Sequence, residues 1–352
     1  MRDVPHRADG LILVGDMTAI GADDRQLRAA LSHRHLNRIR RGAYVPADVF
    51  GASTRDSRYD LRIAAVVATR RSLPVLSHYS AARLWGFPVV NDWPFEVHLT
   101  IPRESGRRTK NGVIVHRHAL VDADLAERCG LLITSRIRTL LDLARIAPFR
   151  DAVAALDHAL HEGIVSREEL LIEAQLLGAD RGQARVERAI TFASPLATLP
   201  GESYSRVLMH ELGFPAPELQ HEFVIPLAGC RYADFWWKGI RLIGEFDGKT
   251  KYFDPQFTRG KNPQEVFWQE KRRENELHDH ETRLARWTWE DLDLVEPFVR
   301  RLEMAGLQRS RGESPERGGR EPGEGAAKET RCDTPKSDTP GLQQPETCGR
   351  LS

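Results

Sequence analysis

The chain has 352 residues, more than a single hydrophobic core usually holds, so two or more domains are expected. Its hydrophobic content of 41% and charged content of 29% are typical of a globular protein, and because the sequence has no apolar run long enough to cross a bilayer, we expect no membrane association. A formal net charge of only +1 gives no indication of a nucleic-acid partner, while four scattered cysteines without a CxxC motif argue against a cysteine zinc site and favour a cytoplasmic location.

Composition and turn residues divide the chain into four regions of an α/β (α+β) fold. We expect a basic helical unit over residues 1–50, a mixed α/β domain over 51–197 and a third unit over 198–307. Residues 308–352 contain no aromatic residue and no Val, Ile or Met. Such a composition cannot bury enough apolar surface to offset the entropy of ordering, so this tail is predicted to be disordered.

The N-terminal region has the pattern of a winged helix-turn-helix. Acidic residues precede a first short helix, and apolar spacing predicts a second helix over 32–40, followed by a strand from Ala43 to Val45. Residues 25–41 contain six arginines and no acid. If the second helix enters the major groove, it brings four side chains to DNA: Arg34, Asn37, Arg38 and Arg41. The alternative is a solvated basic face on a structural helical hairpin.

The middle region predicts a mixture of helices and strands. The segment from Ser77 to Pro88 is typical of a short helix ended by Gly86, and residues 95–101 and 113–118 alternate as strands. Three helices are predicted over 135–147, 151–162 and 166–177, with Ser135 and Ser166 as caps. The basic loop over 103–110 either contacts a phosphate backbone or is simply solvated.

Histidines in the middle region raise the question of a metal site. His98 and His116 fall on two predicted strands and could face each other, while His78 and His118 lie nearby in sequence. Because the sequence shows no cysteine or acid that completes a ligand set, surface or partly buried sheet histidines are the favoured interpretation.

Acidic residues mark the third region. A helix opens at Pro200 with Glu202 in its first turn, and strands are predicted over 220–225, 230–237 and 240–246. Asp234 falls on the second of these strands, while Glu245 and Asp247, two residues apart, share one face at the end of the third. Gathered carboxylates repel one another unless a cation lies between them, and Mg²⁺ or Mn²⁺ prefers such oxygen ligands. An exposed edge strand whose acids pair with nearby basic residues is the alternative.

A helix over 263–282, a strand over 283–289 and a last helix to Met304 complete this region. The order of helix, three strands, helix and strand resembles the PD-(D/E)XK nuclease fold. The residues resemble one branch of it, the very-short-patch-repair endonuclease-like DUF559 family. The similarity rests on Glu202, on Asp234, on the segment from Glu245 to Gly248 and on the segment from Arg286 to Leu292.

The resemblance implies a Mg²⁺-dependent DNA endonuclease. It implies that Asp234, Glu245 and Asp247 hold the metal and that Glu202 is an outer ligand or orienting group. The family motif carries a lysine where this chain has Asp247, so the catalytic positive charge is expected from Lys249 or Lys251, with Lys271 as a further alternative.

A second resemblance covers the N-terminal unit and the segment from Ser77 to Ala82, which are similar to the AbiEi-type antitoxin domain of bacterial toxin–antitoxin systems. It implies an alternative function: a non-catalytic transcriptional regulator, with DNA and a cognate toxin as partners, that retains the nuclease fold as a scaffold. The sequence leaves the oligomeric state and the DNA site open.

Overall fold

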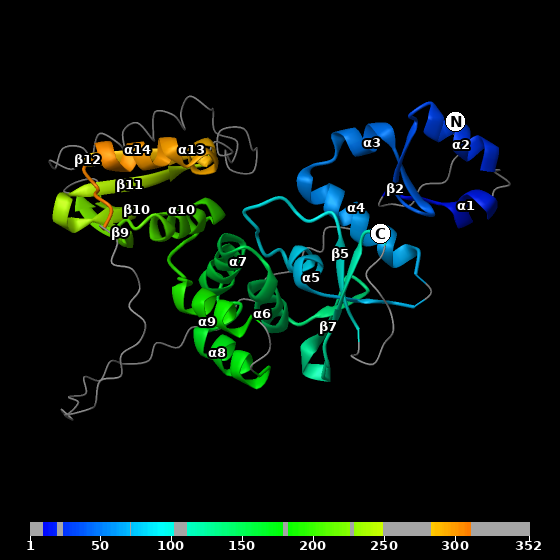
Figure 1. Cartoon of the computed structure of the whole chain (residues 1–352), viewed down its shortest axis with the longest axis horizontal. Coiled ribbons are helices and arrows are strands. Elements are labelled where there is room, and N and C mark those ends of the chain that lie inside the picture. Colours follow the sequence, from blue (N-terminus) through cyan, green and yellow to red (C-terminus); the bar gives the residue numbers. More distant parts are fainter. Residues whose placement is uncertain are drawn as a thin grey trace.

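The computed structural model describes residues 10–19, 24–70, 72–101, 111–178, 182–225, 229–248 and 283–310. The fold is a mixture of helices and strands, as predicted, and its strands form three sheets in the described part. In Figure 1 the first helices and the last strands lie at opposite ends of the molecule, with the middle region between them. None of the helices within these ranges is long and apolar enough to cross a membrane.

The N-terminal unit begins with β1 (Ile12–Leu13), α1 (Val14–Ala19) and α2 (Asp24–Ser32) and continues with the hairpin β2 (Leu36–Arg40) and β3 (Ala43–Pro46). The second helix predicted over 32–40 is therefore wrong, because Leu36–Arg40 is a strand that pairs antiparallel with β3. Helix α2 ends in a Schellman-type turn, in which His35 N donates to Ala30 O and Arg34 adopts a left-handed φ of 57°.

The middle region contains a five-stranded sheet in the order β6-β5-β4-β8-β7. Its strands are β4 (Val75–Leu76), β5 (Val97–Ile101), β6 (Val113–Arg117), β7 (Leu125–Arg128) and β8 (Leu131–Thr134). The predicted strands at 95–101 and 113–118 are confirmed as β5 and β6, which run parallel. The predicted basic loop over 103–110 lies outside the described residues.

Among the helices of this region, the one that begins at His78 packs on β5 and β8. The predicted helices are confirmed as α5 (His78–Trp85), α6 (Arg136–Ile146), α7 (Phe149–His161) and α8 (Arg167–Leu176). Ser135 and Ser166 cap α6 and α8 through their side chains, as expected. Helices α3 (Ala47–Ala52), α4 (Arg55–Ala68) and α9 (Gln183–Phe192) were not predicted.

The C-terminal unit consists of α10 (Pro200–Glu211) and a four-stranded sheet in the order β12-β11-β10-β9. Strands β9 (Glu218–Ile225), β10 (Gly229–Trp237) and β11 (Leu242–Asp247) form an antiparallel meander, and β12 (Arg283–Thr288) runs parallel to β11. The predicted order of these elements is confirmed, whereas the helix over 263–282 lies outside the described residues.

The last helix predicted from the sequence is divided in two, α13 (Trp289–Leu294) and α14 (Glu296–Met304). Val295 separates them with a left-handed φ of 61°. Pro297 follows at the start of α14, where its missing N–H interrupts no helical hydrogen bond.

The core of the C-terminal unit lies between the sheet and its helices. Aromatic side chains dominate this core, including Phe235, Trp237, Phe246 and Trp287. A Cβ at Gly201 would collide with the Phe246 ring, so only glycine lets the start of α10 approach β11 this closely.

Helix α10 also packs on α7 of the middle region. Arg206 Nη1 of α10 donates to Asp157 Oδ2 of α7 over 2.8 Å, and Arg150 Nη1 donates to the Tyr204 hydroxyl over 2.8 Å. The middle and C-terminal units are therefore joined through the helix that carries Glu202.

Candidate functional site

Asp234 lies where strands β10 and β11 separate. Backbone pairing between them ends at Phe235 and Gly244. Beyond that pair a side chain replaces the backbone hydrogen bonds between the strands: Phe246 N donates to Asp234 Oδ2 over 3.0 Å. The carboxylate therefore lies against β11 at Phe246, the residue between Glu245 and Asp247.

Glu202 approaches the same place from the first turn of α10. Its side chain is buried, and its carboxylate accepts hydrogen bonds from Thr198 N at 2.9 Å and from Gln220 Nε2 at 3.4 Å. Burial, and then the negative charge of Asp234, raise the pKa of Glu202 to about 7. The structure thus brings Glu202 and Asp234 together.

Glu245 points to a different partner. Parallel pairing of β11 and β12 sets it beside Arg286, whose Nε and Nη2 atoms lie 2.8 and 2.7 Å from Glu245 Oε2. Asp247, one residue beyond Phe246, is half-exposed at the end of β11. Within the described ranges, Asp234, Glu245 and Asp247 do not form a group whose ligand atoms all lie within 4.8 Å of one another. Lys249 and Lys251 lie outside these ranges, as does Lys271.

The titration of Glu202 predicts a pH-dependent stability. In the unfolded chain this carboxyl group loses its proton near 4.5, whereas in the folded chain it does so near 7, so the folded state binds the proton more tightly. The resulting stabilisation is complete below pH 4.5 and is lost as the pH rises through 7. Glutamine at this position does not titrate. We expect the free energy of unfolding of wild type to fall relative to Glu202→Gln between these pH values, measured by urea denaturation; parallel pH profiles would contradict the assignment.

The predicted DNA-binding residues lie on the N-terminal hairpin, not on a helix. Asn37 and Arg38 are on β2, Arg41 is in the turn before β3, and Arg34 closes α2. Arg34, Arg38 and Arg41 are exposed.

Two arginines that the sequence did not single out join this surface. Arg40 of β2 and Arg62 of α4 line a cavity of about 490 Å³ together with Arg38 and Arg41, and the lining residues that the structure describes include no carboxylate. Burial, and then the charge of Arg70, lower the pKa of Arg40. We call these four arginines the basic hairpin surface.

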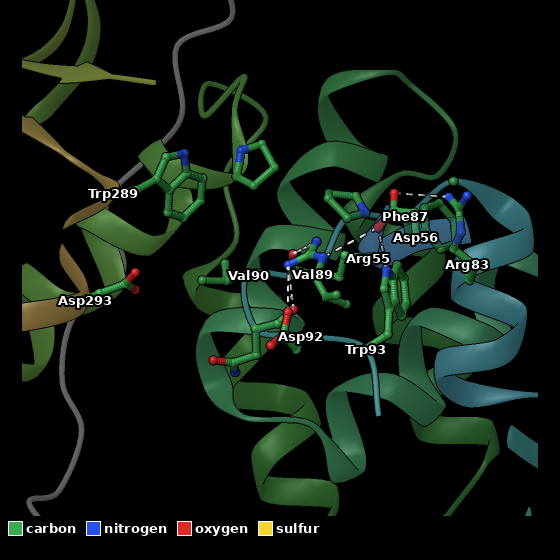
Figure 2. A pocket seen from close by; sticks show the side chains of 14 residues that line it. Arg55, Asp56, Arg83, Phe87, Val89, Val90, Asp92, Trp93, Trp289 and Asp293 are labelled. Carbon is green, nitrogen blue, oxygen red and sulfur yellow. Dashed lines mark hydrogen bonds and ion pairs between the residues drawn. The ribbon is translucent and has the colours of Figure 1, made fainter. Parts of the chain in front are cut away.

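A second cavity, of about 610 Å³, lies between the middle and C-terminal units. Figure 2 shows Trp289 and Asp293 on one side of it and Arg55, Asp92 and Trp93 on the other. Both arginines of its lining contact acids of the same lining: Arg83 contacts Asp56, and Arg55 contacts Asp56 and Asp92. None of the residues predicted to be catalytic lines it.

No family model matches the chain. Two uncharacterized proteins of Mycobacterium tuberculosis, MT2308 of strain CDC 1551 / Oshkosh and Rv2248 of strain H37Rv, are each 29% identical to it over 194 residues, which is 54% of this chain and 70% of each relative. The crystal structure of the RV2827C protein from the same organism aligns at 19% identity with a TM-score of 0.37, covering 64% of this chain and 85% of that one.

Proposed function

We propose that the chain is a cytoplasmic DNA-binding protein whose C-terminal unit hydrolyses DNA phosphodiesters with Mg²⁺ or Mn²⁺. The observation that supports this most is the juxtaposition of Glu202 and Asp234 where β10 and β11 separate. Two carboxylates this close, one of them buried, share a proton or a cation.

The residues present fit a hard divalent cation. Asp234 and Glu202 offer carboxylate oxygens, and Asp247 offers a third from the exposed end of β11. When bound, such an ion lowers the pKa of a water ligand and stabilises charge on the phosphate. The Asp234 carboxylate is already oriented by Phe246 N, and Thr198 orients Glu202, whereas within the described residues Asp247 has to turn toward them before all three can share an ion.

Glu245 can become a further ligand of the cation only if its carboxylate breaks the ion pair with Arg286. The pair is partly exposed, with Arg286 at 31% and Glu245 at 14% side-chain exposure, so water competes with the contact. A phosphate group arriving at the sheet edge would compete for the same guanidinium, since Arg binds phosphate and carboxylate with equal geometric ease. In this proposal Arg286 positions the DNA phosphate while Glu245 turns toward the cation.

The basic hairpin surface is the proposed DNA-binding element. Phosphate contacts supply most of the affinity of such surfaces, and they make it dependent on salt. We expect Arg38→Ala to weaken binding to duplex DNA and to reduce the slope of log K against log salt concentration by about 1. Fluorescence anisotropy with a labelled duplex at several salt concentrations measures both quantities.

Arg300→Ala provides the matched control, because Arg300 is an exposed arginine on α14, 2.8 Å from Glu296. Equal slopes for wild type, Arg38→Ala and Arg300→Ala would remove the hairpin from the DNA interface.

A non-catalytic regulator is the second candidate function, and the contact between Glu245 and Arg286 favours it. An acid neutralised by an arginine contributes to a stable scaffold without binding a cation. This alternative keeps DNA and a cognate toxin as partners and needs no hydrolysis.

Incubation of the full chain with supercoiled, linear and single-stranded DNA in Mg²⁺ or Mn²⁺ distinguishes the nuclease from the non-catalytic regulator. Metal-dependent cleavage that EDTA abolishes supports the nuclease. Binding of DNA without cleavage of any of these substrates would contradict the nuclease proposal and support the regulator.

A further inference from the structure

Three histidines from separate elements meet in the middle region. His78 is the first residue of α5, His98 lies on β5 and His116 lies on β6. One ring nitrogen from each lies within 4.8 Å of the other two, and His98 Nδ1 is 2.9 Å from His116 Nε2. The rings of His78 and His116 stack with centroids 3.5 Å apart.

Hydrogen bonding within the described part of the chain does not satisfy this cluster. His98 is 3% exposed, and its Nε2 atom is buried without a hydrogen-bond partner. Asp142 of α6 is fully buried, and its Oδ2 atom likewise lacks a hydrogen bond while lying 3.9 Å from His78 Nδ1. Buried polar atoms are nearly always paired, so an orphaned nitrogen on His98 and an orphaned carboxylate oxygen beside His78 indicate that the cluster as it stands is incomplete.

The backbone conformation at His78 is also unusual. Its φ of 49° lies in the left-handed region, which a side chain with a Cβ rarely adopts. Such conformations persist where the surrounding structure fixes them, and they cluster at binding sites. Here the conformation directs the His78 ring at His116 and His98.

We propose that His78, His98 and His116 bind one transition-metal ion of the zinc class. Imidazole nitrogens suit Zn²⁺, whereas Mg²⁺ prefers oxygen, so this site is distinct from the acidic one. Bonds of about 2.0–2.1 Å in a tetrahedral site hold donor atoms roughly 3.4 Å apart. The stacked rings of His78 and His116 would turn so that their in-plane lone pairs meet at the ion. Water takes the fourth position.

Asp142 completes the arrangement from outside the ligand set. A carboxylate that accepts from the second nitrogen of a ligating histidine fixes the ring and its tautomer. His78 Nδ1 faces Asp142 Oδ2 and also lies 3.0 Å from Ser77 Oγ, which leaves Nε2 for the metal. Arg138 holds Asp142 in turn, through a hydrogen bond of 3.0 Å from its Nε to Oδ1.

The histidines are in the form that binds metal. Burial, and then the charge of His116, lower the pKa of His98 to about 3, while burial, and then the charge of His118, lower the pKa of His116 to about 4. Both rings are therefore neutral at physiological pH and each keeps one nitrogen lone pair. A metal at this point would join the start of α5 to two parallel strands.

Zinc binding by the full chain tests the proposal. The probe is Zn²⁺ alone, measured by competition with a chromogenic chelator in excess Mg²⁺, which occupies any oxygen site. We expect one equivalent bound by wild type. His116→Phe keeps the ring stacking but removes both nitrogens, and we expect an affinity at least about 100-fold lower, since second-shell partners alone are worth 10- to 100-fold.

The same substitution at the exposed His161 of α7, His161→Phe, is the matched control and should bind zinc as wild type does. Absence of zinc binding by wild type, or equal binding by wild type and His116→Phe, would overturn the proposal. Cobalt substitution of wild type needs no variant: four-coordinate Co²⁺ absorbs strongly in the visible range and six-coordinate Co²⁺ weakly, and only a four-coordinate spectrum agrees with this site.

Discussion

Asp234→Asn is expected to lower Mg²⁺-dependent DNA cleavage about a thousand-fold while leaving DNA affinity unchanged. A metal's stabilisation of developing charge is worth several kcal/mol, and each 1.4 kcal/mol or so of activation free energy changes a rate tenfold. Asparagine still accepts a hydrogen bond from Phe246 N, so the strand ends should keep their positions. Single-turnover cleavage of a labelled duplex measures the rate.

Glu222→Gln is the matched control for this experiment. Glu222 lies on β9 of the same sheet, is exposed and contacts the Tyr232 hydroxyl over 3.2 Å, away from the acidic site. Its variant should cleave at the wild-type rate. Cleavage by Asp234→Asn at that same rate would show that the carboxylate takes no part in the reaction.

Asp157→Ala is expected to lower the free energy of unfolding by about 3–5 kcal/mol, the usual cost of removing one partner from a buried ion pair. Asp157 is fully buried on α7, where it accepts from Arg206 Nη1 at 2.8 Å and from Ser194 N at 2.6 Å. Its removal leaves the Arg206 guanidinium, whose side chain is 11% exposed, without its carboxylate. Urea denaturation followed by circular dichroism measures the loss.

The exposed pair of Glu296 and Arg300 is the comparison, with side-chain exposures of 79% and 68%. Glu296→Ala should cost less than about 1 kcal/mol, because water screens such pairs. Replacing both Asp157 and Arg206 by apolar residues of similar size should cost less than Asp157→Ala alone. Equal losses from Asp157→Ala and Glu296→Ala would show that burial adds nothing to the Asp157 contact.

The elements of the C-terminal unit could be predicted because their signals are local. Pro200 and Gly213 bound a helix, and alternating apolar residues mark β10 and β11 between turns. The position of Asp234 beside Glu245 does not follow from counting, because the predicted strands over 230–237 and 240–246 would pair Trp237 with Ile240, whereas the structure pairs Trp237 with Leu242. The partner of Glu245 does not follow either, because the register of β11 against β12 spans 41 residues and no local pattern encodes it.

The N-terminal hairpin shows why short segments mislead. Leu36 and Ile39 are three residues apart, a spacing that suits a helix. In the structure the pairing register of β2 shifts between Arg38 and Arg40. Because of this irregularity, the apolar residues of the strand do not alternate with the period of two that identifies a regular strand. The prediction of a helix is wrong for that reason, although Arg38 and Arg41 are exposed as a basic surface would require.

The histidine cluster is predicted only in part. The sequence raises His78, His98 and His116 as candidates and favours an interpretation without a metal, while the approach of His78 and of Asp142 from two different helices depends on tertiary packing. Zinc sites with recognisable spacing keep their ligands close in sequence, whereas this group is assembled by tertiary packing.

Helix α10 bears Glu202 in its first turn and Arg206 one turn later, and Arg206 is attached to α7. The acidic residue and the anchor are thus about 6 Å apart along one rigid rod. Any displacement of α7 is transmitted to the carboxylate at the sheet edge. A fragment that starts at residue 198 would retain every predicted metal ligand and still lack the surface that fixes the orientation of Glu202.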